Sequence, residues 1–175
     1  MRAIAIGRLA LQHSRAWEKT PSIEIFFDGK HVIEGKATAF TNGAIEAAII
    51  HSRALLEFLG LGGNGQTKLK ELSAPRKLGD AGIEHYSGLV KLSIQAAVLA
   101  YPGASAEAEA ALAYVIYLAN KGLAHTTSSF TSNDEGSSLL DIAFRGVPTL
   151  VVNSFYIPLQ IQPPSYELQG RKRVA

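Results

Sequence analysis

The stretch "TNGAIEAAIIHSRALLEFLGLGG" (residues 41–63) decides the fold class. Apolar residues recur in it every three or four positions, the spacing of one helix face: Ala44, Ala47, Ala48, His51, Leu55 and Phe58. Thr41 or Asn42 can cap the first turn, and Gly60 can end the helix. Because another element must cover such a stripe, the stretch predicts a helix over about 43–60 inside a helical domain.

A second helix is predicted from about residue 105 to 126. Ser105 is a suitable N-cap, and Glu107 places negative charge where the helix dipole favours it. Its apolar stripe consists of Ala111, Val115, Leu118, Gly122 and His125. We expect the two helices to pack against each other and to bury four residues between them: Leu55, Phe58, Val115 and Leu118.

Residues 22–35, "SIEIFFDGKHVIEG", predict a β-hairpin, because Asp28-Gly29 between two β-rich runs is a strong two-residue turn signal. For residues 1–20 the pattern leaves helix and strand open. Glycine, lysine and Pro75 predict a loop from the end of the first helix to about Asp80. Residues 83–101 carry enough apolar content for a further helix.

The C-terminal region is helical by spacing over 139–150, and Pro148 suits the first turn of another helix. The β-propensity of "TLVVNSFYI" keeps a strand open as the alternative. Residues 165–175 are expected to form a flexible tail. The chain as a whole, residues 1–175, is predicted to be a single helical domain.

Composition narrows the function classes. The chain has 175 residues, 47% of them apolar and 18% charged, which is typical of a globular protein. It contains no cysteine, so a disulfide framework, a thiolate nucleophile and a cysteine-based metal site are excluded. We find no apolar run long enough to cross a bilayer and no signal-peptide core, so we expect a cytoplasmic protein without membrane contact.

Charge gives weaker guidance, because the net charge is only +2. Basic residues gather in two places: Lys68, Lys70, Arg76 and Lys77, and then Arg171, Lys172 and Arg173. Either cluster could bind nucleic-acid phosphates. Solvated loops and tails carry such residues routinely, so we favour the interpretation that both clusters are solvated surface residues.

Known site motifs are missing. The chain has no Walker phosphate loop, no Rossmann glycine fingerprint after a strand and no His-Glu-x-x-His motif. The glycine-rich "GLGGNG" (residues 60–65) follows a helix, which favours a flexible linker. No group of carboxylates or histidines has metal-ligand spacing, so we expect neither a metal nor another cofactor.

Two histidines on the predicted helices are the candidates for chemistry. His51 has Arg53 beside it, and His125 follows Asn120 and Lys121. A single histidine on an apolar stripe is more often a satisfied core residue than a catalyst. Two such residues on neighbouring helices could instead meet across a groove.

"IIHSRALLEFLGL" together with "YLANKGLAHTT" resembles a group of uncharacterised bacterial proteins. In those proteins a helix with His-x-Arg-x-Leu-x-x-Phe precedes a helix with Asn-Lys-x-x-Ala-His. They look like distant relatives of the HEPN superfamily, whose members are compact bundles of mainly four helices that commonly dimerise. The resemblance implies a mainly α, HEPN-like helical bundle, here with a short N-terminal β-hairpin, and a homodimer.

Many HEPN proteins are metal-independent ribonucleases that carry an arginine, then a polar residue that is often Asn, then a histidine. The resemblance puts His125 at the histidine position and Asn120 at the polar one, but Ala119 falls where the arginine belongs. Lys121 or Arg53 would have to supply the missing positive charge. Arg8 to His13, "RLALQH", matches the spacing by itself, but it precedes the hairpin and we discount it.

Two hypotheses follow. The first, which the missing arginine favours, is a non-catalytic dimeric binding module in which Asn120, His125, His51 and Arg53 form a structural polar network. The alternative is a metal-independent ribonuclease of toxin–antitoxin or defence type, with RNA as its partner. There His125 would be the general acid or base, Asn120 and Lys121 would assist it, and His51 and Arg53 would bind the substrate.

Overall fold

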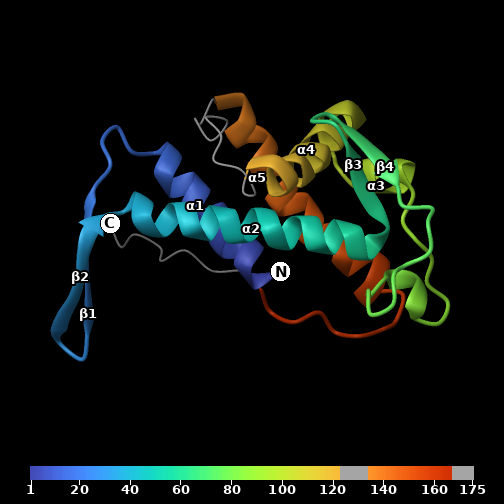
Figure 1. Ribbon diagram of the computed structural model, residues 1–175, viewed down its shortest axis with the longest axis horizontal. Coiled ribbons are helices and arrows are strands. Elements are labelled where there is room, and N and C mark those ends of the chain that lie inside the picture. Colours follow the sequence, from blue (N-terminus) through green and yellow to red (C-terminus); the bar gives the residue numbers. More distant parts are fainter. Residues whose placement is uncertain (123–133, 167–175) are drawn as a thin grey trace.

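The computed structural model describes residues 1–122 and 134–166, and the chain there is mainly helical with two small antiparallel hairpins (Figure 1). Its elements in chain order are α1 (Arg2–Arg15), β1 (Ser22–Phe27), β2 (Lys30–Lys36), α2 (Thr38–Leu59), β3 (Leu61–Asn64), β4 (Lys68–Glu71), the 3-10 turn η1 (Ile83–His85), α3 (Ile94–Leu99), α4 (Ser105–Tyr117), the π-helix η2 (Leu118–Gly122), α5 (Asp134–Val151) and the π-helix η4 (Val152–Tyr156). The mainly α prediction is confirmed.

Helix α1 occupies the N-terminal region for which the pattern had left helix and strand open. Its buried positions are Ile4, Gly7, Ala10 and Leu11, which have helical spacing. Two of them are a glycine and an alanine, so the hydrophobic pattern of the sequence does not show this face clearly. Gly7 lets α1 approach α2 closely, since a β-carbon there would lie 2.6 Å from the carbonyl oxygen of Ala44. The two helices cross in direct contact (Figure 1).

Helix α2 buries a different face from the predicted one. Its buried residues are Ala48, Ile49, Ser52, Leu56 and Leu59, whereas His51 is exposed. The prediction that His51 belongs to the covered stripe is therefore wrong. The helix is apolar on most sides, so the sequence pattern could not choose the face, and the close contact with Gly7 of α1 does.

The α2–α4 packing is as predicted, with a shift at one side. Val115 and Leu118 are buried, and α2 contacts both α4 and η2. Leu55 and Phe58 are only half-buried at the edge of the core. The ring of Phe58 instead meets Phe155 edge to face, with ring centroids 5.4 Å apart.

The predicted loop after α2 contains the β3–β4 hairpin, so the flexible-linker interpretation of "GLGGNG" is wrong. Gly60 ends α2 in the left-handed region at φ 97°, as expected. Gly63 then lies in β3 where a β-carbon would come within 3.0 Å of the Ile116 side chain. This glycine in β3 allows the strand to pack closely against α4. A glycine-rich composition alone does not distinguish such a packed strand from a flexible linker.

The helix predicted over 83–101 is also wrong. Only η1 and the six residues of α3 are helical there, and Gly88 between them has φ 80°. The segment is held by hydrogen bonds to backbone carbonyls of neighbouring segments rather than by a helical stripe. Lys91 Nζ donates to the carbonyl oxygens of Leu72 and Ala74, at 2.7 and 3.3 Å, and Leu92 N–H donates to that of Leu59 at 2.8 Å.

Three helix ends differ from the prediction. Helix α2 begins at Thr38 with Ala37 as its N-cap, so Thr41 and Asn42 lie inside the helix and do not cap it. Ala104 is the N-cap of α4, with no side-chain cap, in place of Ser105. Pro148 lies inside α5, buried, rather than at the first turn of another helix. The chain continues from α5 into η4, so residues 149–156 are helical and the strand alternative is wrong. Most of the predicted tail, residues 167–175, lies outside the described residues.

Candidate functional site

His51 and Arg53 lie on α2 with their side chains exposed to solvent. The guanidinium of Arg53 pairs with the carboxylate of Glu57 one turn along the helix, with 3.3 Å between Nη2 and Oε2. Both side chains are almost half exposed, at 45% and 46%, so this pair is a solvated surface pair that contributes little to stability.

Asn120 and Lys121 lie on η2, the wider π-helical turn that continues α4, and both are exposed. His125 lies outside the described residues. Since α2 contacts η2, the two pairs of predicted site residues are on neighbouring elements. Within residues 1–122 and 134–166, no hydrogen bond or ion pair joins His51 or Arg53 to Asn120 or Lys121.

The basic residues of the predicted loop are partly engaged in structural contacts. Lys68 pairs with Glu109 of α4 at 3.0 Å. Arg76 is nearly buried, with 10% of its side chain exposed, and it donates to Glu84 at 3.0 Å and to the Phe58 carbonyl at 3.1 Å. These two cations are therefore directed at protein carboxylates, which supports the structural interpretation over the nucleic-acid one.

Arg8, the arginine of the discounted motif, connects two helices. Its Nε donates to Oδ1 of Asp141 on α5 at 2.9 Å, and Arg145 Nε lies 3.1 Å from the other oxygen of that carboxylate. One aspartate is thus shared by two guanidinium groups. His13 is exposed on α1 and is not part of this cluster.

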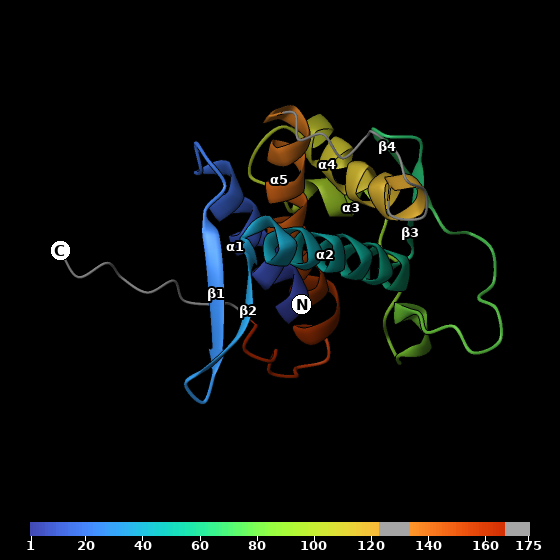
Figure 2. The same cartoon turned by 60° about the vertical axis from the view of Figure 1, so that its left-hand side comes forward.

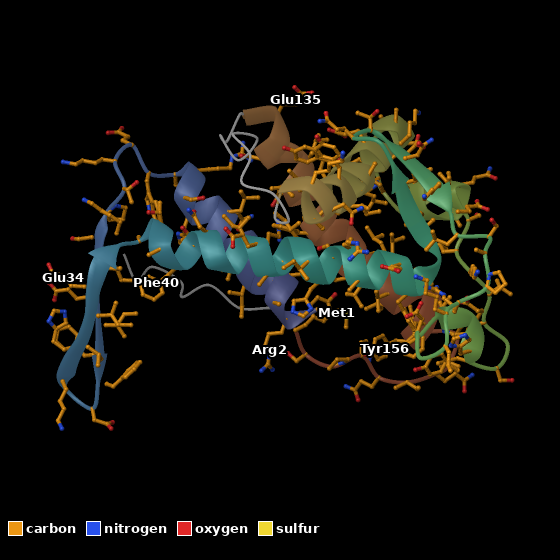
Figure 3. The ribbon with its side chains drawn as sticks, viewed as in Figure 1. Met1, Arg2, Glu34, Phe40, Glu135 and Tyr156 are labelled. Atoms are coloured by element: carbon orange, nitrogen blue, oxygen red, sulfur yellow. The ribbon has the colours of Figure 1, made fainter. Side chains whose placement is uncertain are left out.

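The β1–β2 hairpin projects from the helices at one end of the molecule (Figures 1 and 2). Four of its large apolar side chains are exposed: Phe26 (52%), Phe27 (62%), Val32 (51%) and Ile33 (40%). Figure 3 shows Glu34 on this hairpin, away from the helices. Phe40 is labelled near the start of α2, where the helix follows the hairpin. The hairpin itself was predicted, but its exposure was not.

The two strands of this hairpin differ at their edges. Strand β1 is regular, whereas the register shifts between Ile25 and Phe26 so that Val32 of β2 has no partner. Glu24 and Glu34 are directly opposite each other, an unfavourable pair of like charges. Neither strand pairs with any other strand among the described residues, so both outer edges are free.

One feature of the sequence could have indicated this surface. A hairpin with one covered face alternates apolar and polar residues, whereas "SIEIFF" ends in two adjacent aromatic residues. Phe26 and Phe27 therefore point to opposite faces, and the helices cannot cover both. Phe26 stacks on His31 of β2, with ring centroids 5.0 Å apart.

Comparison of the chain with protein-family models, with curated proteins and with solved structures finds no match. The resemblance to HEPN-like proteins therefore stays a prediction. Among the residues that the structure describes, no helix is both long and apolar enough to span a membrane.

Proposed function

We propose that the protein is a non-catalytic binding module that acts as a homodimer, in which the β1 strands of two copies pair edge to edge. The observation that carries the proposal is the projecting hairpin, with exposed Phe27 and Ile33 and a regular, unpaired β1 edge. A two-stranded hairpin alone is marginally stable in water, and three or more strands with an apolar face are needed for independent stability.

The choice of β1 over β2 follows from the bulge. An irregular strand pairs poorly with another strand, and bulges are one of the ways in which proteins protect sheet edges. The unpaired Val32 places this irregularity on β2, which leaves β1 as the edge able to accept a partner.

The strand that pairs with this β1 edge is β1 of a second copy of the chain, because the edge is self-complementary. In an antiparallel pair with Ile25 on the two-fold axis, Ile25 faces Ile25 of the second copy and Ile23 faces its Phe27. Glu24 then lies opposite Phe26 and clear of the other Glu24. Ile23 and Ile25 are already half-buried, so this pairing extends an existing apolar face across four strands.

The positions of the predicted site residues that the structure describes, which do not include His125, support the non-catalytic hypothesis. A general acid or base needs neighbours that hold its geometry. His51, Asn120 and Lys121 are exposed, and Arg53 is engaged with Glu57. The same exposure argues against the buried polar network that we expected for these residues, so the binding surface is placed on the hairpin instead.

The oligomeric state tests the proposal. Light scattering should give the wild-type protein twice the 18.7 kDa mass of the chain, and Ile25→Asp should give the mass of one chain. Val32→Asp is the matched control: it puts the same charge on the other, bulged strand and should leave the dimer intact. A monomeric wild-type protein at high concentration would refute the proposal, as would equal dissociation by the two variants.

A further inference from the structure

A pocket of about 240 Å³ lies between α3, α4 and α5, and its lining does not include His51, Arg53, Asn120 or Lys121. Its floor is apolar and buried: Ala97, Ala108, Leu112, Ile142 and Leu150. Its rim is exposed and includes Ala100, Arg145 and Thr149. The pocket therefore combines an apolar floor with an opening to solvent, the usual form of a small-molecule site.

Small residues on all three helices create the space. Ala97 and Ala100 come from α3 and its C-cap, Ala108 from α4 and Gly146 from α5. A β-carbon at Gly146 would meet only Leu112 Cδ2, at 3.9 Å, so even this position has room for a larger side chain. Larger side chains at these positions would fill the pocket, so its volume depends on the small residues that all three helices contribute.

Arg145 gives the pocket its chemical character. Its side chain is 49% exposed, and its guanidinium lies 3.1 Å from the Asp141 carboxylate, measured from Nε. A guanidinium has five N–H donors, so this pair leaves donors for a further acceptor. Its partner Asp141 is also bound by Arg8, so two positive charges share one negative charge. A guanidinium in this position is suited to a carboxylate.

A second polar group on the rim is already satisfied. The hydroxyl of Tyr101 donates to Glu107 of α4 at 2.9 Å, so the Glu107 carboxylate is held by a hydrogen bond at the start of that helix. The Tyr101 ring forms part of the apolar wall. The recognition of charge at the mouth therefore falls to Arg145.

We infer that this pocket binds a small monocarboxylate with a compact apolar body, such as an aromatic acid of the size of benzoate. The apolar body would lie on the floor between Ala108 and Leu112, and the carboxylate would meet Arg145. The volume fits: a cavity of about 150 Å³ holds benzene, and pockets for drug-sized ligands begin at about 300 Å³.

Calorimetric titration of the 175-residue chain with benzoate, benzyl alcohol and acetate tests the inference. Benzoate should bind the wild type, benzyl alcohol should bind at least tenfold more weakly, and acetate should give no measurable heat. Arg145→Gln should reduce benzoate affinity at least tenfold and leave benzyl alcohol unchanged. Arg145→Lys, which keeps the charge, should retain part of the benzoate preference.

Variants that fill the pocket provide a second, independent test of the inference. Ala108→Leu should abolish the binding of both aromatic compounds, and a melting curve will show whether this variant is folded. Ala100→Leu, on the exposed rim, is the substitute if Ala108→Leu does not fold. No benzoate binding by the wild type, or binding that survives both the filling variant and Arg145→Gln, would overturn the inference.

Discussion

Gly7 of α1 lies directly against Ala48 of α2, and this contact determines which face of α2 is buried. On the far side of α2 from this core, Ile50 is left 52% exposed although it lies next to the fully buried Ile49. The orientation of α2 also fixes His51 in solvent. One glycine thus decides the position of a residue that the sequence pattern had assigned to the core.

Replacing this glycine gives the first prediction. Gly7→Ala should destabilise the protein by roughly 1–3 kcal/mol, because a β-carbon there overlaps Ala48 and the Ala44 carbonyl. The control is Gly43→Ala in α2, where a β-carbon meets nothing within 4 Å. Alanine should there leave stability unchanged or raise it by up to about 1 kcal/mol. Urea denaturation of both variants measures the difference, and equal effects would contradict the packing described.

The second prediction concerns the dependence of stability on pH. Hydrogen bonds from Arg76 lower the pKa of Glu84 to about 2, against an ordinary value near 4.5, and Lys91 lies 3.4 Å from the same carboxylate. A folded-state pKa below the unfolded one stabilises the protein above the unfolded pKa. This contribution should therefore be complete above about pH 4.5 and be lost as the pH falls toward 2.

Thermal denaturation between pH 2 and 6 measures this effect. Glu84→Gln should melt at a lower temperature than wild type at pH 6, and the two should converge toward pH 2. The expected loss at pH 6 is on the order of 1–3 kcal/mol, as for a hydrogen-bonded charged group. A constant gap between the two proteins across this range would show that the ionised Glu84–Arg76 pair does not stabilise the fold.

The third prediction separates the two functional hypotheses. If the protein is the non-catalytic binding module proposed above, the purified protein should not cleave a labelled RNA pool in the presence of EDTA. His125→Ala, at the histidine position that the resemblance implies, is the informative variant. EDTA-resistant cleavage by the wild type that disappears in His125→Ala would establish the ribonuclease alternative and reject the non-catalytic proposal.

Local signals predicted those elements whose cause is local. Asp28 and Gly29 both adopt positive φ, 50° and 78°, so the turn between β1 and β2 follows from two adjacent residues. The helix around Val115 follows from its stripe of buried residues. By contrast, β3 depends on the contact between Gly63 and Ile116, more than fifty residues apart, which no local pattern contains.

The candidate site was harder to predict than the fold for the same reason. The exposure of His51 depends on the rotation of α2, and that of Asn120 on the turn where α4 becomes π-helical. The pocket beside Arg145 depends on small residues from three helices that meet only in the folded chain. Composition and spacing describe one element at a time, whereas these sites arise between elements.

The most direct test of the account is a cross-linking measurement at the proposed dimer axis. The chain contains no cysteine, so one introduced residue can report a single position. If Ile25 faces its own copy across the two-fold axis, the Ile25→Cys protein should form a disulfide-linked dimer rapidly under mild oxidation, at protein concentrations where the wild type is dimeric. Glu24→Cys, one position away and on the opposite face of β1, should remain largely monomeric on a non-reducing gel. Equal cross-linking of the two variants, or none in Ile25→Cys, would contradict the pairing of the β1 strands.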